Sequence, residues 1–90
     1  MYVYILTNHI NTVLYTGVTN NFIRRLSEHI KHFSKESFVT KYRLYKLVWF
    51  QEFNTPIEAI EAEKKIKGWK RYKKLNLITQ TNRDFKNLLF

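Results

Sequence analysis

Three short apolar runs along the chain have the pattern of β-strands. Residues 2–6 and 13–16 are rich in tyrosine, valine and other residues that suit a pleated, half-buried surface. The turn formers of residues 7–12 between them predict a hairpin loop. Residues 46–53 are almost continuously apolar, which predicts a strand that is buried on both faces and therefore lies at the centre of a sheet. Gly17 follows the second run, where its missing Cβ predicts a bend in the backbone.

Helical signals occupy the segments after the second and third apolar runs. Residue types that cap helix N-termini predict a helix that begins near residues 20–21. Residues 55–58, Thr-Pro-Ile-Glu, combine an N-cap, a first-turn proline and a capping box, which predicts a helix over residues 56–67. Gly68 is expected to end that helix, and residues 69–78 predict a shorter last helix.

These elements predict an α+β fold made of one domain over residues 1–90. The expected architecture is a three-stranded antiparallel sheet flanked by helices in the order ββαβαα. Ninety residues, 44% of them hydrophobic, are enough for one modest core but not for two. The chain has no cysteine, which excludes disulfides and thiolate metal sites. No run approaches the roughly 20 apolar residues of a membrane span, and a cytoplasmic location is expected.

Two of the predicted helices each turn a charged residue toward their apolar side. On the first helix, Arg25 and His29 lie at the edge of the apolar stripe, and on helix 56–67 Glu63 falls inside the apolar arc. An unpaired buried charge is costly, so each inward charge needs a partner. Arg25 either clamps an anionic ligand or reaches water or a structural carboxylate. Glu63 either holds a metal or forms a salt bridge with Lys67, one turn further on.

Positive charge dominates the composition. The chain has 16 lysines and arginines against seven acidic residues, a formal net charge of +9. Such an excess in a small domain favours a polyanionic partner, nucleic acid first. Charge for solubility alone and attraction to anionic lipid are the alternatives, and lipid ranks lower because no long basic amphipathic helix stands out. The basic residues around the last helix that are expected to contact nucleic acid are Lys67, Lys70, Arg71, Lys73 and Lys74.

Short motifs spread over nearly the whole chain resemble the GIY-YIG nuclease superfamily. They are Tyr2-Val3-Tyr4, Tyr15-Thr16-Gly17, Arg25 and His29, Lys41-Tyr42, Glu52-Phe53, the run from Glu63 to Trp69, Leu77-Ile78 and Asn82. The likeness is greatest to small single-domain bacterial members, which are similar to the nuclease domain of the excision-repair nuclease. Tyr2 stands where the name of the first motif has glycine, and Thr16 where the name of the second has isoleucine; neither position carries the chemistry.

The resemblance implies a metal-dependent endonuclease that hydrolyses phosphodiester bonds in DNA, structured or branched DNA included, with DNA repair as the expected context. Glu63 matches the metal-binding glutamate, with Mg²⁺ or Mn²⁺ as the expected cofactor, and Arg25 matches the phosphate-binding arginine. Tyr4 and Tyr15 match the two motif tyrosines, and Tyr15 is the expected general base. The remaining matches are two accessory catalytic positions, His29 and Lys41, and a C-terminal polar position expected to contact nucleic acid, Asn82.

Two other functional classes are compatible with the same residues. One is a nucleic-acid-binding module that keeps the fold and the charge but does not cleave; the joint presence of Tyr15, Arg25 and Glu63 argues against it. The other is an interaction protein that docks through its aromatic residues. DNA is the expected partner, with no membrane association, and the expected oligomeric state is a monomer or weak dimer.

Overall fold

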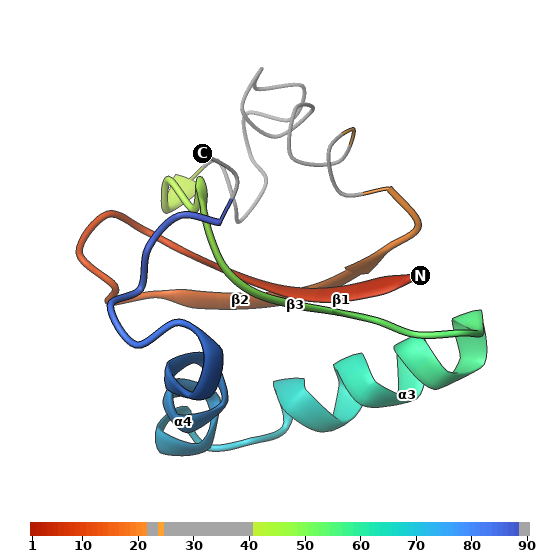
Figure 1. The fold of residues 1–90 in the computed structure, drawn as a ribbon. Helices are drawn as coiled ribbons and strands as arrows, with labels where there is room; N and C mark the ends of the chain where they lie inside the picture. The colour runs from red at the N-terminus through yellow and green to blue at the C-terminus, as the bar shows by residue number, and fades with distance from the viewer. Residues whose placement is uncertain (22–23, 25–40, 89–90) are drawn as a thin grey trace.

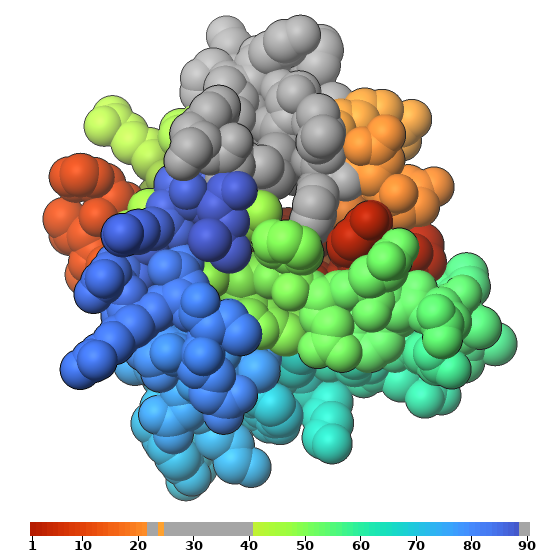
Figure 2. Space-filling view, viewed as in Figure 1, coloured from red at the N-terminus to blue at the C-terminus, as the bar shows by residue number. Residues whose placement is uncertain are grey.

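A three-stranded antiparallel sheet forms the centre of the protein. The computed structural model describes residues 1–21, 24 and 41–88. Its elements are β1 (Tyr2–Thr7), β2 (Leu14–Thr19), β3 (Lys46–Glu52), α3 (Pro56–Lys67) and α4 (Arg71–Thr81). The strand order is β2-β1-β3, and α3 and α4 lie on the same side of the sheet (Figure 1). The predicted α+β class and antiparallel sheet are confirmed. Figure 2 shows that α3, β3 and α4 form one continuous surface.

The loop between β1 and β2 is held by polar side chains in place of ladder hydrogen bonds. Asn8 Oδ1 accepts from the backbone N–H of Thr12 at 2.8 Å and of Val13 at 3.1 Å. Asn8 Nδ2 donates to Thr12 Oγ1 at 2.7 Å, and Thr7 Oγ1 donates to the Val13 carbonyl at 2.8 Å. These are the short-range contacts that Asn and Thr offer in turns. The predicted hairpin is confirmed, with Thr7 as the last residue of β1.

The predicted central position of the third strand is wrong. β1 is the middle strand, and β3 pairs with β1 alone at one edge of the sheet. The apolar run is explained by layers above and below the strand: Val48 and Trp49 pack on the helix side, and Leu47 packs on the opposite side. Phe50, further along, is 45% exposed. A strand is buried on both faces when other elements cover the sheet above and below it. A central position is a different property, because it requires hydrogen-bonded strands on both sides.

The sheet separates two apolar clusters. The helix-side cluster contains the buried residues Val3, Ile5, Val48, Trp49, Ala59, Ile66 and Ile78. The cluster on the opposite face, called here the tyrosine-side cluster, contains Tyr4, Leu6, Leu44 and Leu47, with Val13, Tyr15 and Tyr45 packed against it. The alternation of side chains along β1 thus sends Val3 and Ile5 to the helices and Tyr4 and Leu6 to the other face.

The helix caps follow the sequence signals. Thr55 Oγ1 accepts from the Glu58 N–H at 3.2 Å, so α3 begins with the predicted cap and proline. Gly68 caps its C-terminus with a φ of −78°, a conformation open to any residue. Asn21 Oδ1 accepts from the Arg24 N–H at 3.2 Å, which is the contact of an N-cap at the predicted first helix. The rest of that helix, with Arg25 and His29, and residues 32–40 of the predicted loop lie outside the described residues.

The sequence predicted that Gly17 bends the chain after the second strand, and this prediction is wrong. It lies inside that strand, directly opposite Tyr4 of β1, and its φ is not positive. The glycine is required for space and not for backbone conformation, as the geometry around Tyr4 shows below.

The last helix begins and ends later than predicted, because Lys70 is its N-cap and Asn82 its C-cap. The amide of Asn82 donates to the Val48 carbonyl at 3.0 Å and to the Lys86 carbonyl at 2.8 Å. Its Oδ1 accepts from the Lys86 N–H at 3.0 Å. This side chain therefore ties the end of α4 and the following tail to β3.

Candidate functional site

The two motif tyrosines lie on one face of the β1–β2 hairpin. Tyr4 is opposite Gly17 and Leu6 is opposite Tyr15, so the tyrosines occupy diagonal positions on adjacent strands. Their ring centroids are 6.4 Å apart and the rings are tilted by 42°. Tyr4 is 1% exposed and Tyr15 is half-buried, which places the more accessible ring on the edge strand.

Gly17 provides the space in which the Tyr4 ring lies. A Cβ on Gly17 would come within 2.5 Å of both Cζ and Oη of Tyr4, and within 3.0 Å of Cε2. Carbon atoms in contact are ordinarily about 3.5–4.0 Å apart, so no side chain fits there while the ring keeps its place. The glycine of the second motif thus sets the position of the tyrosine of the first.

Helix α3 brings a carboxylate and an ammonium group to the edge strand β2. Glu63 is 8% exposed, in agreement with its predicted inward position. Lys67 Nζ lies 2.5 Å from Glu63 Oε1 and 6.0 Å from the centroid of the Tyr15 ring. The salt bridge that the sequence left open as an alternative to metal binding is therefore present, and it adjoins the motif tyrosine.

Lys67 keeps its positive charge at neutral pH. The hydrogen bond to Glu63 raises the pKa of Lys67 above 10.5, desolvation opposes the rise, and the charges of Glu63 and Tyr15 add to it. A lysine whose pKa is raised by folding stabilises the folded state below its unfolded pKa. That contribution is lost only as the pH rises through the higher folded value. The ammonium thus remains beside Tyr15 across the neutral range.

The donor set fits a hard divalent cation that keeps most of its water. In residues 1–21, 24 and 41–88, no three His, Cys, Asp or Glu side chains gather as a metal cage. Mg²⁺ commonly binds one or two carboxylates, water and substrate phosphates, so a lone carboxylate suffices. Glu63 is that carboxylate, and the ammonium already in contact with it shows that its surroundings accept a cation.

The other predicted catalytic residues are only partly placed. Lys41 is exposed, and its Nζ lies 5.5 Å from the centroid of the Tyr42 ring. It lies three residues before Leu44, a member of the tyrosine-side cluster. The structure places Tyr4 beside Tyr15, and Glu63 is linked to Tyr15 through Lys67.

Asn82 is not brought to this group. It is 6% exposed and bonded to β3, at the sheet edge opposite β2. All of the polar atoms of its side chain bond to main chain, which gives it a structural role in the fold. Its predicted contact with nucleic acid stays a prediction.

The predicted basic surface residues are exposed or half-buried around α4. Lys67, Lys70, Arg71 and Lys73 are exposed, and Lys74 is half-buried. Arg71 donates to the Asn11 carbonyl at 2.8 Å, and Lys73 Nζ lies 5.6 Å from the centroid of the Trp69 ring. Arg71 therefore also joins α4 to the hairpin loop.

Two features of the site were missed by the sequence reasoning. The proximity of Lys67 to Tyr15 depends on how α3 crosses the sheet, which the spacing of residues within α3 does not determine. The contact of Gly17 with Tyr4 depends on strand register. Pairing the flanks of the predicted loop 7–12 would have placed Tyr4 opposite Tyr15, two residues away from the observed register, in which Tyr4 is opposite Gly17.

The chain matches one family of known proteins and one solved structure. Residues 1–76 match the family described as the GIY-YIG catalytic domain. The chain is also similar to the solution NMR structure of a UPF0213 protein from Bacillus halodurans, at 31% sequence identity and a TM-score of 0.59. The match covers 96% of this chain and 89% of that one. No curated protein matches the chain. Within the described residues, no helix has the length and apolar character needed to cross a membrane.

Proposed function

Because this chain belongs to the GIY-YIG family, we propose that it is a metal-dependent endonuclease that hydrolyses phosphodiester bonds in DNA, structured or branched DNA included. The observation that supports the proposal is a series of neighbours: the Tyr4 and Tyr15 rings are 6.4 Å apart, and Lys67, which pairs with Glu63, lies 6.0 Å from the Tyr15 ring. Two hydroxyl groups and a buried carboxylate supply proton transfer and a cation ligand, which are needs of phosphodiester hydrolysis. Incubation with plasmid, nicked and branched DNA in Mg²⁺ or Mn²⁺ tests the activity and ranks the substrates.

Each residue of the group has a distinct role in this proposal. Glu63 would hold the divalent cation, which when bound polarises the phosphate and lowers the pKa of bound water. Tyr15, in its phenolate form, acts as the general base: it takes a proton from the attacking water and becomes the neutral phenol. Tyr4, buried beside it, orients the Tyr15 ring and hydroxyl. The expected phosphate contacts and accessory groups, Arg25, His29 and Lys41, complete the site.

Lys67 stabilises negative charge on either of its neighbours. Its ammonium pairs with Glu63 and lies close enough to Tyr15 to attract negative charge on the Tyr15 oxygen before the proton is transferred. When a divalent cation binds Glu63, the two positive charges compete for one carboxylate. Lys67 is 54% exposed, so it can move toward Tyr15 or the substrate phosphate without a large cost.

Replacing Lys67 by methionine is expected to tighten Mn²⁺ binding by about threefold to tenfold, because an ammonium in contact with Glu63 no longer competes. Mn²⁺ titration followed by water-proton relaxation measures this. Lys64→Met removes an equal charge from the exposed side of α3 and should change the affinity by less than about twofold. Equal effects of the two substitutions would show that Lys67 acts only through net charge.

DNA binding by this protein is expected to weaken steeply with salt. The chain carries a net charge of +9, and its basic residues around α4 are accessible. Backbone contacts release counterions, so the logarithm of affinity should fall linearly with the logarithm of salt concentration, by about 0.9 per phosphate contact on duplex DNA. Fluorescence anisotropy between low and physiological salt measures the slope. A flat response would remove nucleic acid as the partner.

The alternative is a DNA-binding module on the same fold that does not cleave. The observation that favours it is the Glu63–Lys67 salt bridge, which satisfies the buried carboxylate without a metal. This module would bind DNA with the same salt dependence but leave every substrate intact in Mg²⁺ and Mn²⁺.

A further inference from the structure

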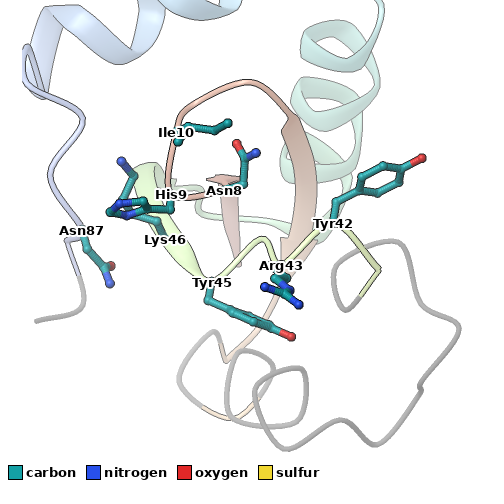
Figure 3. A pocket seen from close by; sticks show the side chains of 8 residues that line it. All are labelled: Asn8, His9, Ile10, Tyr42, Arg43, Tyr45, Lys46 and Asn87. Carbon is teal, nitrogen blue, oxygen red and sulfur yellow. The ribbon is translucent and has the colours of Figure 1, made fainter.

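A concave surface lies at the hairpin-loop end of the sheet, apart from the Glu63–Lys67 pair. It is a cavity of about 670 Å³. Figure 3 shows its walls coming from the β1–β2 loop, from the segment that leads into β3 and from the C-terminal tail. The lining residues are Asn8, His9, Ile10, Tyr42, Arg43, Tyr45, Lys46 and Asn87. A volume of this size is within the range of small-ligand sites.

The walls of the cavity are held in place by main-chain contacts. Asn8 accepts two backbone N–H groups of its own loop. Asn87 Oδ1 accepts from the Leu47 N–H at 3.2 Å, which fixes the tail against β3. The Tyr45 N–H donates to the Arg43 carbonyl at 3.0 Å, and Arg43 adopts a left-handed φ of 56°. The side chains of Asn8 and Asn87 thus stabilise the walls of the cavity, and the other lining residues are the candidates for ligand contacts.

The remaining side chains combine aromatic rings with positive charge. Tyr42 and Tyr45 offer rings, Arg43 and Lys46 offer cations, and none of the eight lining residues is acidic. Tyr42 is 40% exposed, so its ring is accessible from solvent. Aromatic faces stack on nucleobases, and arginine and lysine bind phosphate oxygens. A planar group attached to a phosphate matches this lining.

The cavity is on the same face of the sheet as the motif tyrosines. Tyr45 lines it and packs on the tyrosine-side cluster, which also supports Tyr15. Asn8 is four residues along the chain from Tyr4, or about 13 Å at the rise of an extended strand. Successive nucleotides of one DNA strand rise by about 3.4 Å along the helix axis, so a few nucleotides span this distance. One strand can therefore occupy the cavity and the candidate site together.

We propose that this cavity binds one unpaired nucleotide of the DNA strand that enters the candidate site. Its base stacks on Tyr42 and Tyr45, and its phosphate pairs with Arg43 and Lys46. A base inside a duplex is stacked on its neighbours and cannot enter, so the cavity selects strands with an unpaired segment. The inference rests on the proposed function for its choice of ligand but concerns binding and not cleavage.

The test compares binding of single-stranded DNA of about 12 nucleotides and duplex DNA of about 12 base pairs. Binding is measured by fluorescence anisotropy with EDTA present, so that no cleavage occurs. The variant Tyr42→Ala/Arg43→Gly removes one ring and one cation, and glycine adopts the φ of Arg43 without strain. Ile57→Ala/Lys64→Ala removes one exposed apolar side chain and one cation from α3, and is the matched control. The cavity variant should lose about tenfold in single-strand affinity and no more duplex affinity than the control.

Equal losses on single-stranded and duplex DNA would overturn the proposal, because the residues would then act only as backbone charge. Wild-type protein supplies a second measurement that needs no variant. Single-stranded DNA should shift the amide NMR signals of residues 8–10 and 42–46, and duplex DNA should leave them in place; the same shifts with both would also overturn it. The cleavage assay remains separate, since strand-selective binding without cleavage would refute only the proposed function.

Discussion

Gly17→Ala is expected to lower the melting temperature by roughly 10 °C and to reduce cleavage at least tenfold. The new methyl group would be 2.5 Å from Cζ and Oη of Tyr4, a residue that is 1% exposed. Overpacking of this kind costs about 1–3 kcal/mol, and 1 kcal/mol shifts the melting temperature of a domain of this size by about 4–8 °C. Displacement of the Tyr4 ring also moves Tyr15, its neighbour in the proposed site.

The other glycine provides the control for this substitution. A Cβ on Gly68 would be 3.6 Å from the nearest atom, the Lys65 carbonyl oxygen, at an ordinary helical φ. Gly68→Ala should therefore melt within about 4 °C of wild type. In the double variant Tyr4→Ala/Gly17→Ala the clash is absent, so its stability should match that of Tyr4→Ala alone. Additive losses would show that the cost of Gly17→Ala does not come from the Tyr4 ring.

Local sequence signals predicted most of the elements in this fold. The Thr-Pro-Ile-Glu start of α3 and the turn formers between β1 and β2 depend on neighbours within a few residues, and both predictions are confirmed. The inward position of Glu63 followed from helical periodicity alone, and its burial is confirmed.

The errors arose where an element's environment depends on distant parts of the chain. The order of strands in the sheet is set by pairing between segments more than 30 residues apart, so the apolar run of β3 did not reveal its edge position. The role of Gly17 depends on the register with β1. The contact between Lys67 and Tyr15 joins a helix to an edge strand, and no periodicity within either element contains it.

Glu63→Gln is expected to reduce metal-dependent cleavage by at least about 100-fold while the protein stays folded. The substitution keeps the shape of the side chain but removes the charge that would hold the cation, and a catalytic metal supplies several kcal/mol of charge stabilisation. Stability should change by no more than about 1 kcal/mol, because Lys67 is 54% exposed and returns to water. Thermal melting with and without Mg²⁺ checks that the loss is not one of folding.

Glu61→Gln is the matched control for this variant. Glu61 lies on the same helix two residues earlier and is exposed, so the substitution removes an equal charge outside the site. It should retain cleavage within about twofold of wild type, since exposed charges that are far from the reacting group are screened by salt.

The most direct test of the proposed function is the initial rate of cleavage of branched DNA in Mg²⁺ by wild type, Glu63→Gln and Glu61→Gln. We expect cleavage by wild type and Glu61→Gln, none detectable with EDTA, and a loss of at least about 100-fold in Glu63→Gln with unchanged melting. Full cleavage by folded Glu63→Gln would contradict the proposed function. A large loss of stability in Glu63→Gln, with cleavage retained by the fraction that stays folded, would contradict it too. Glu63 would then be a structural acid whose partner is Lys67.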